Sequence, residues 1–552
     1  MVLPVIRHAL TFARTVKNTM NQAARRYLLS EKGSRFLGWT VFCAFIYPFL
    51  TASAFTTLDG PGHIHNAKVI HALLTQSDSL FERYFELNTF ISPNLLGHYI
   101  LLVVVLVVGE DYADRTMLVL CMLTQFAALQ YFVRSLKLSF ALALLPICFL
   151  INTPLFSGFY SFSLGVAAMF WTAGYAARNI DKLWEGVLVR FQMVILASML
   201  VLVYLLHLVP AVIACAMVAI AYLLSVFNRI PNHQWRWRLL WRSMKPLFFA
   251  ALPVVLLIAV YQLHDAETSN YVFIEKSELW RQWGAMQGFI INHRHEFAFT
   301  RWYWLVPAVA LIADVVLSLF KGLQNYREKN PKQAMLMLAG YMLTLAALYF
   351  VMPDASSGGG ALTVRLNYLL VTVMSIFILS CIRSSILQWL AVSALVIVSF
   401  DHAHKILSYH NDQSYFMRDI REMKSAIQEP GVLLVHRFRY DWPLEHVTKY
   451  LGNHHDVVMV DALGAHKIYA PVMWKPDFRN REELVAMFDK GWQRNPREIL
   501  DIFPTEHLYV LTIGRAPAED SVAYAAWVNE LYLRGAQETW STDSLMHLYS
   551  IK

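Results

Sequence analysis

The residue best placed for acid–base chemistry is Asp59, in the segment LDGPGH at residues 58–63, just after the first long apolar run. Glycine and proline on its C-terminal side restrict the direction of its side chain. A carboxylate beside an apolar membrane surface is partly desolvated, which tunes its strength as a base toward a hydroxyl proton. The structural alternative, an N-cap for a helix that starts near His63, has about equal weight on sequence grounds.

Two histidines follow at positions 63 and 65, and together with Asp59 they could bracket a divalent cation. Their spacing matches no established metal signature, and a histidine in a loop is more often a polar surface group. The sequence therefore requires no cofactor, and it leaves a divalent metal at His63 and His65 open. The same two side chains are candidates for substrate contact.

A second acidic cluster ends the same stretch of chain and contains Glu110, Asp111 and Asp114. Its plain interpretation is a solvated junction before the next apolar run. The functional alternative is a second carboxylate at the cavity that Asp59 faces, which makes Glu110 and Asp111 candidates for substrate binding.

Polar side chains also interrupt the apolar sequence farther along, in YLLHLVP at residues 204–210 and in the glycine-rich stretch that ends at Arg365. Polar groups at membrane depth are costly and usually line a cavity or a helix interface, which applies to Tyr204 and His207. A guanidinium offers a fork of donors that suits two phosphate oxygens. The alternative for Arg365 is an interfacial arginine whose head group reaches the membrane surface.

The composition shows what must position these residues. Of the 552 residues, 57% are hydrophobic and 16% are charged, against about 45–50% and about 25% in soluble proteins. A single water-soluble core could not cover that much apolar surface, so the chain is predicted to be a polytopic membrane protein. The net charge of +8 comes from Lys and Arg clustered between apolar runs, which indicates membrane topology rather than a nucleic-acid partner.

The positions of the basic residues fix the topology. The basic segment 1–35 is predicted to be cytoplasmic, and a transmembrane domain 36–400 follows, with a long external loop at 58–115. If the run at 93–109 crossed the membrane, two strongly basic loops would face outward, so we interpret it as a re-entrant or membrane-surface helix. About eleven spans remain, with the N-terminus inside and the C-terminus outside: 36–56, 116–133, 138–153, 159–177, 189–206, 208–227, 247–262, 302–320, 333–352, 366–382 and 385–400.

The composition changes after residue 400, and residues 401–552 are predicted to form a small external α/β domain. Its predicted strands are 432–435, 457–460, 507–512 and 546–551, and its predicted helices are 413–428, 481–490 and 521–534. A run rich in His and Tyr between positions 436 and 455 could be a substrate lid or ordinary surface, and the sequence slightly favours surface.

This pattern resembles the GT-C superfamily of membrane glycosyltransferases, bacterial members included. The resemblance rests on the external Asp in LDGPGH, on GFYSF at 158–162, on Tyr204 to Pro210, and on the segment from Pro353 to Arg365. It implies a GT-C-like helical fold, a polyprenyl-phosphate-linked sugar donor and a catalytic role for Asp59. Family members often carry a second acid in this loop, whereas here no adjacent Glu follows Asp59.

The sequence thus predicts a glycosyltransferase that moves a hexose or pentose from a polyprenyl phosphate to a glycan, lipid or protein acceptor at the external membrane face. Asp59 would be the general base, while Arg365 and His207 would hold the leaving phosphate. The predicted location is a bacterial inner membrane, with the C-terminal domain in the periplasm or outside. The alternatives are a lipid or polysaccharide transporter or flippase, for which Asp314 within a predicted span is the main sign, another lipid-linked group transfer, and a non-catalytic scaffold.

Overall fold

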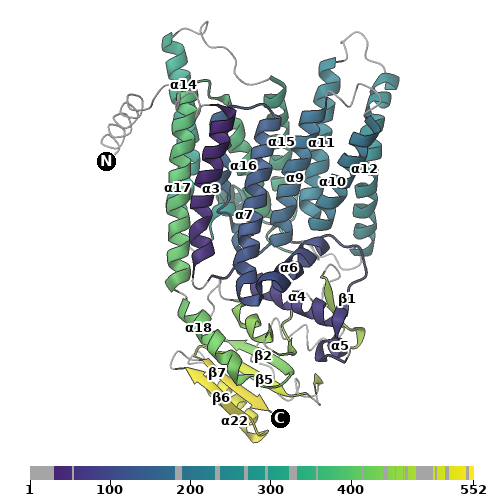
Figure 1. Cartoon of the computed structure of the whole chain (residues 1–552), viewed down its shortest axis with the longest axis vertical. Helices are drawn as coiled ribbons and strands as arrows, with labels where there is room; N and C mark the ends of the chain where they lie inside the picture. Colours follow the sequence, from purple (N-terminus) through teal and green to yellow (C-terminus); the bar gives the residue numbers. More distant parts are fainter. Residues whose placement is uncertain are drawn as a thin grey trace, which may run out of the picture.

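The protein has an elongated shape, with a helical bundle at one end and a smaller mixed domain at the other (Figure 1). The computed structural model describes residues 30–52, 55–76, 78–180, 189–229, 237–265, 271–291, 296–321, 332–355, 359–412, 414–438, 445–453, 455–463, 465, 470–479, 502–503, 506–515, 521–542 and 546–551. The start of the first long helix and the mixed domain lie at opposite ends of the bundle.

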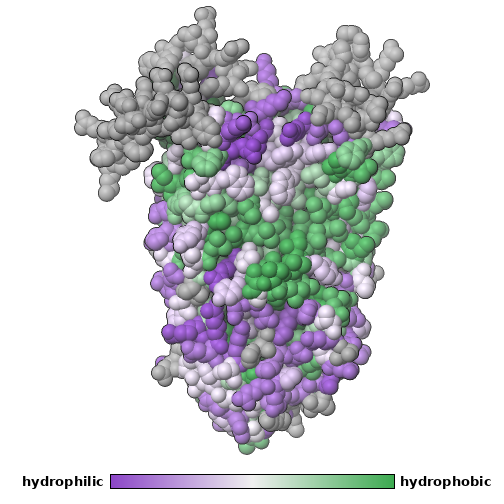
Figure 2. All heavy atoms as spheres, viewed as in Figure 1, coloured by the Kyte–Doolittle hydropathy of each residue, from purple (hydrophilic) through white to green (hydrophobic). Residues whose placement is uncertain are grey.

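Long helices make up the bundle, and the face seen in Figure 2 carries an apolar belt between two polar zones. The helices are α3 (Glu31–Thr51), α7 (Glu110–Ser135), α9 (Tyr160–Asn179), α10 (Val189–Leu206), α11 (Leu208–Arg229), α12 (Trp237–Asp265), α14 (Phe297–Lys321), α15 (Lys332–Val351), α16 (Leu362–Cys381) and α17 (Ser385–Asp412). Among the described residues, seven helices are long and apolar enough to cross a membrane: α7, α11, α12, α14, α15, α16 and α17. The chain is a multi-pass membrane protein.

One predicted span has a different structure. The apolar run at 138–153 forms no long α-helix but two short 3₁₀ helices, η1 (Phe140–Ala143) and η2 (Leu145–Phe149), followed by the single turn α8 (Thr153–Phe156). Residues 141–151 are all buried, against α3, α7 and α17. Backbone outside regular α-helix is tolerated at membrane depth where protein covers it, and Pro146 lies in this segment. The prediction of a spanning α-helix here was wrong.

The loop after α3 folds at the boundary between the bundle and the mixed domain (Figure 1). It contains α4 (Gly60–Thr75), α5 (Leu80–Tyr84), the short strand β1 (Phe85–Leu87) and α6 (Leu95–Val108). Helix α6 has only 14 residues, too few for the roughly 20 that a membrane span needs. It also exposes Val103, Leu106 and Val107, so its apolar side suits the membrane surface, as predicted for the run at 93–109.

The C-terminal part is a five-stranded mixed sheet with the strand order β3-β2-β5-β7-β6. Its strands are β2 (Gly431–Arg437), β3 (Val457–Met459), β5 (Leu508–Ile513), β6 (Gln537–Thr542) and β7 (Met546–Ile551). The helical elements are α18 (Ser414–Met423), η8 (Lys424–Ala426), η10 (Val447–Asn453), α19 (Pro476–Arg479) and α22 (Ser521–Leu533). Strand β2 pairs in parallel with β3 and β5, while β7 pairs antiparallel with β5 and β6. The predicted helix at 481–490 lies outside the described residues.

The first loop and the C-terminal part are joined by backbone pairing and side-chain hydrogen bonds. Strand β1 pairs antiparallel with β4 (Val472–Trp474). From α4, the amide of Asn66 donates to the carbonyl of Leu463 at 3.0 Å, and the ammonium of Lys68 donates to the carbonyl of His455 at 2.9 Å. Helix α4 also packs against η10. The loop that carries Asp59 is therefore held between the bundle and the C-terminal part.

Candidate active site

Asp59 lies at the junction of three parts of the chain. It precedes α4 as the N-cap residue, yet its side chain makes no cap hydrogen bond. Its backbone N–H donates to the carbonyl of Ser157 at 3.1 Å, and one carboxylate oxygen lies 3.3 Å from Nε2 of His446. The side chain is 17% exposed. Because the carboxylate is not used to cap the helix and part of it reaches solvent, it can meet a substrate.

The turn beneath Asp59 is clamped by a buried carboxylate, Asp114 on α7. The side chain of Asp114 accepts hydrogen bonds from the N–H and the hydroxyl of Thr57, at 2.8 and 2.9 Å. It also accepts from the hydroxyls of Tyr160 and Tyr450. With 1% exposure and partners on three other elements, Asp114 positions the turn rather than meeting a substrate.

Replacing Asp114 by asparagine should therefore destabilise the fold. The amide group would place N–H donors against Thr57 or the tyrosine hydroxyls, and losing such buried bonds costs about 1–3 kcal/mol. Asp111→Asn is the matched control, because that carboxylate is 53% exposed and forms only a surface ion pair with Lys424. Thermal unfolding in detergent should show a clearly lower midpoint for the Asp114 variant alone, and equal midpoints would contradict the clamp.

Histidines and a lysine surround the base of the candidate site. The His63 ring lies 5.0 Å from that of His98, centre to centre, and 6.2 Å from that of Tyr160. Burial, with the nearby His98 and Lys449, lowers the pKa of His63 well below its usual value. Burial also lowers the pKa of His446, helped by Lys449. Both imidazoles are therefore neutral near pH 7, so the ring that lies 3.3 Å from the Asp59 carboxylate is uncharged.

These buried histidines predict loss of stability in acid. His63, His436 and His446 all have pKa values lowered by burial, that of His436 to about 3. An unfolded chain binds protons at these histidines near pH 6.5, whereas the folded chain does not, so stability is complete above about pH 6.5 and is lost as the pH falls. The thermal midpoint should drop between about pH 7 and pH 5. The double variant His63→Gln, His446→Gln should show a weaker dependence, and an unchanged dependence would exclude this cause.

A second group of polar residues lies around Arg365 near the start of α16. Its guanidinium stacks over the rings of Phe159 and Phe162, at 4.1 and 5.5 Å from their centres, and Nη1 lies 3.1 Å from Nε2 of His207. Nδ1 of His207 lies 3.1 Å from the backbone nitrogen of Val209. A guanidinium can only donate, so in this pair Nε2 of His207 is the acceptor and the ring helps to hold Arg365 in place. The remaining N–H groups of Arg365 suit an anionic oxygen.

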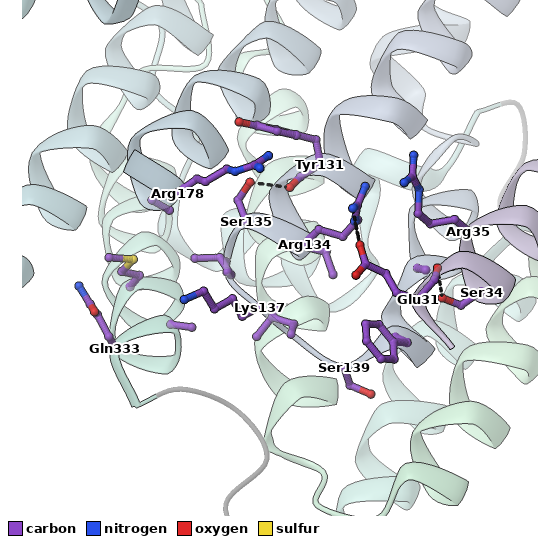
Figure 3. A pocket seen from close by; sticks show the side chains of 18 of the residues that line it. Glu31, Ser34, Arg35, Tyr131, Arg134, Ser135, Lys137, Ser139, Arg178 and Gln333 are labelled. Atoms are coloured by element: carbon purple, nitrogen blue, oxygen red, sulfur yellow. Dashed lines mark hydrogen bonds and ion pairs between the residues drawn. The ribbon is translucent and has the colours of Figure 1, made fainter. Parts of the chain in front are cut away.

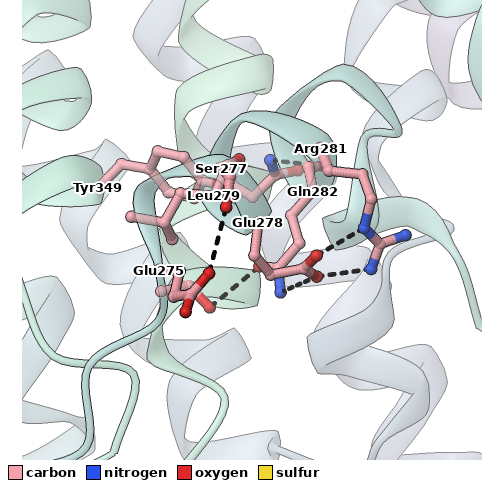
Figure 4. A network of polar contacts seen from close by, with 9 residues as sticks. Glu275, Ser277, Glu278, Leu279, Arg281, Gln282 and Tyr349 are labelled. Carbon is pink, nitrogen blue, oxygen red and sulfur yellow. Dashed lines mark hydrogen bonds and ion pairs between the residues drawn. The ribbon is translucent and has the colours of Figure 1, made fainter.

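Two neighbouring segments hold Arg365 in place. The carboxylate of Asp354 accepts from the N–H of Thr363 at 3.0 Å and so caps the first turn of α16. Helix α13 (Lys276–Gly284) packs against the same turn, where the amide of Asn367 donates to the carbonyl of Gln282. Figure 4 shows the network that keeps α13 folded: Glu278 pairs with Arg281 and accepts from Gln282, while the hydroxyl of Tyr349 donates to the carbonyl of Leu279.

The two groups of residues meet at one short segment. Asp59 bonds to the carbonyl of Ser157, and Arg365 stacks on the ring of Phe159, two residues farther along. Gly158 between them has φ of +79°, and a Cβ there would lie 2.8 Å from the backbone nitrogen of Gly60. Only glycine allows so close an approach. The backbone of Asp59 and the guanidinium of Arg365 thus lie against neighbouring residues of the same turn.

Other candidate residues lie elsewhere. His65 is two residues from His63 on α4 and therefore points to another side: it is fully buried and lies 5.9 Å from the ring of Phe81. Tyr204 is buried, and its hydroxyl donates to the carbonyls of Ile91 and Leu257. Glu110 interacts electrostatically with Lys68, and Asp111 pairs with Lys424. Among the described residues no group of three metal-binding side chains comes together, so the metal hypothesis for Asp59, His63 and His65 gains no support.

The sequence interpretation underrated the contribution of the C-terminal part. His446 contacts Asp59, and Tyr450 bonds to Asp114, although the His- and Tyr-rich run was slightly favoured as surface. Lys449, three residues after His446, is 1% exposed and lies 3.7 Å from Asp461. The sequence signal that could have indicated this contribution was the spacing of residues 446, 449 and 450, which places them on one side of a helical turn.

Comparison with known proteins identifies the fold. No protein-family model and no curated protein matches the sequence. The crystal structure of ArnT from Cupriavidus metallidurans bound to undecaprenyl phosphate superimposes with a TM-score of 0.51 and 10% identity, over 93% of this chain and 97% of that chain. This chain is similar in fold to ArnT. The apo structure of ArnT covers the same shares at 10% identity, with a TM-score of 0.42.

The likeness to ArnT confirms the fold that the sequence resemblance predicted, the GT-C membrane fold followed by a C-terminal sheet domain. At 10% identity it concerns architecture and assigns no residue a role. It nevertheless extends over the bundle, the first loop and the C-terminal part together, because it covers 93% of this chain. The candidate site lies where those three parts of the ArnT-like fold meet.

Proposed function

We propose that this chain is a membrane glycosyltransferase that takes its sugar from a polyprenyl-phosphate-linked donor. The observation that carries the proposal is the arrangement at residues 157–159, where the backbone of Asp59 bonds to Ser157 and the guanidinium of Arg365 stacks on Phe159, with the Asp59 carboxylate partly exposed. The fold supports it, since the ArnT structure that this chain resembles holds undecaprenyl phosphate. Both the class of the donor substrate and the roles of the residues are proposed.

In the proposed reaction an acceptor hydroxyl attacks the anomeric carbon of the donor sugar. The new bond joins the acceptor oxygen to that carbon, while the bond from the carbon to the phosphate oxygen breaks. Asp59 accepts the hydroxyl proton, and the ring of His446, neutral because burial lowers its pKa, lies 3.3 Å from the carboxylate and helps to keep it aimed at the acceptor. A positioned base of this kind contributes about 10²–10⁴-fold to the rate.

The leaving group is the lipid phosphate, which gains negative charge as the bond to the sugar breaks. Arg365 donates to Nε2 of His207 at 3.1 Å, and its remaining guanidinium N–H groups suit phosphate oxygens. The rings of Phe159 and Phe162 cover one face of the guanidinium, which limits its hydration and fixes its direction. Because the lipid phosphate is itself an activated leaving group, the reaction needs no nucleotide at this face.

The proposed reaction face is the external one. The opposite end of the bundle carries Arg35, Arg134, Lys137 and Arg178 on the ends of α3, α7 and α9 and in the loop after α7. Cytoplasmic loops carry the excess of Lys and Arg, so that end is assigned to the cytoplasm. The proposed location is a bacterial inner membrane, with the C-terminal domain on the periplasmic side.

The transporter alternative loses its main support at Asp314. The carboxylate of Asp314 accepts from the backbone N–H groups of Arg383 and Ser384, at 3.0 and 2.9 Å. It therefore caps the turn that leads into α17 instead of lining a path for an ion or a lipid.

A transfer assay distinguishes a glycosyltransferase from a flippase and from a scaffold. The purified protein in liposomes is given polyprenyl phosphates that carry radiolabelled hexoses or pentoses, together with envelope glycans and lipids as acceptors. We expect the label to leave the polyprenyl lipid and free polyprenyl phosphate to accumulate. Movement of the labelled lipid between leaflets without cleavage would instead indicate a flippase, and no label movement with any donor would favour a scaffold.

A further inference from the structure

A cavity of about 480 Å³ lies at the opposite end of the bundle from the candidate active site, between α3, α7, α9, α15 and the loop after α7 (Figure 3). It is far from Asp59 along every helix that lines it, because α3 begins here and α7 and α9 end here. The proposed sugar transfer makes no use of it.

Positive charge dominates the lining of this cavity. Arg35, Arg134, Lys137 and Arg178 line it, against the single carboxylate of Glu31. Glu31 accepts from Nε of Arg134 at 3.0 Å and so neutralises that guanidinium. Within the described parts of the chain, no carboxylate pairs with the other three cations. Figure 3 shows their side chains around the same hollow, with Arg178 and Lys137 on one side and Arg35 on the other.

The other residues that line the cavity are of two kinds, polar and apolar. Polar groups come from Ser34, Ser135, Ser139, Tyr131 and Gln333. Apolar walls come from Leu136, Leu138, Phe140 and Met337, of which Phe140 is 46% exposed. A small free anion would need no apolar wall, whereas a lipid has a charged head group and a hydrocarbon tail to satisfy both. The end of the apolar belt in Figure 2, where polar surface begins, is the depth at which lipid phosphates lie.

We propose that this cavity binds the phosphate of an anionic phospholipid head group. Arg35 and Arg178 approach the phosphate oxygens with their guanidinium forks, Lys137 adds a point charge, and Phe140 and Leu138 contact the start of the acyl chains. Basic pockets between helices on the cytoplasmic side are suited to such head groups. Free phosphate could contact the same basic residues, but the apolar wall of the cavity favours a lipid.

Native mass spectrometry of the detergent-solubilised protein tests this site. The protein is titrated with phosphatidylglycerol and, separately, with phosphatidylethanolamine, and the fraction carrying one bound lipid is measured. In the wild type we expect retained phosphatidylglycerol. In Arg35→Gln, Arg178→Gln, the apparent affinity for phosphatidylglycerol should fall by roughly tenfold or more, since each basic residue near a lipid phosphate contributes appreciably. Binding of phosphatidylethanolamine should hardly change.

The matched control is Lys32→Gln, Lys332→Gln. Both lysines are exposed near the starts of α3 and α15, at the same end of the bundle, and neither lines the cavity. If both double variants lost affinity for phosphatidylglycerol equally, the loss would reflect general surface charge, and the proposal would be overturned. Displacement of the lipid by millimolar inorganic phosphate would identify a free-phosphate site and overturn it as well. Sugar transfer is not part of this readout, so the outcome is independent of the proposed enzymatic function.

Discussion

Replacing Asp59 by asparagine should lower kcat for sugar transfer by about 10²–10⁴-fold, the usual contribution of a positioned general base. Asparagine keeps the size of the side chain, and the backbone hydrogen bond from residue 59 to the carbonyl of Ser157 does not involve it. The fold and the KM for the lipid donor should therefore change little. Steady-state kinetics with a radiolabelled polyprenyl-phosphate sugar measure both constants.

The control for this substitution is Asp412→Asn, since Asp412 is an exposed carboxylate at the last residue of α17. It lies at the same end of the bundle as Asp59 and should keep wild-type rates. If the Asp59 variant transferred sugar at close to the wild-type rate while remaining folded, Asp59 would not be the base. A loss of folding in the Asp59 variant would instead point to a structural role as the N-cap residue of α4.

Replacing Arg365 by glutamine should produce the second large effect. The variant keeps a polar side chain but loses the positive charge beside the leaving phosphate, and removing one such preorganised donor costs about 10²–10³-fold in kcat. KM for the donor should rise too, because the phosphate is charged before the reaction. Arg365→Lys should recover only part of the rate, since lysine lacks the planar fork that stacks on Phe159.

Arg383 provides the matched control for Arg365. It is exposed just beyond the other end of α16, and only its backbone N–H is bonded to Asp314. Arg383→Gln should leave kcat and KM near wild type. If the Arg365→Gln enzyme had unchanged kinetics, Arg365 would not bind the leaving phosphate, and other residues would have to bind the donor.

Local pattern predicted much of the architecture. The strands β2, β3, β5 and β7 follow runs of apolar and β-branched residues, and each was predicted within one or two residues. Strand β6 was missed because its segment QETWST is largely polar and exposed at the sheet edge. The pairing of β1 with β4 was beyond local pattern, since it joins residues 85–87 to 472–474.

Hydropathy alone could not separate two kinds of buried segment. The run at 138–153 has the apolar composition of a span, yet it contains two 3₁₀ helices, a backbone form that is tolerated because protein covers residues 141–151. The 93–109 run was set apart because the charge of distant loops required one fewer span, and it contains a helix of only 14 residues.

For the candidate site the sequence named individual residues but could not predict their contacts. Asp59 and Arg365 were chosen from their surroundings in the sequence, and their roles stay predictions. That His446 lies 3.3 Å from Asp59, and that Phe159 carries Arg365, depends on how distant segments pack. His63 and His65 were grouped by adjacency, although a helix directs such neighbours to different sides.

The central claim is that one bound lipid phosphate meets both the acid and the guanidinium. A cryo-electron microscopy structure of the chain with a polyprenyl phosphate tests it most directly. We predict the phosphate within hydrogen-bond distance of Arg365 and next to His207, with its sugar-bearing oxygen facing the carboxylate of Asp59. A phosphate bound away from Arg365, for example only in the basic cavity at the opposite end of the bundle, would contradict the account.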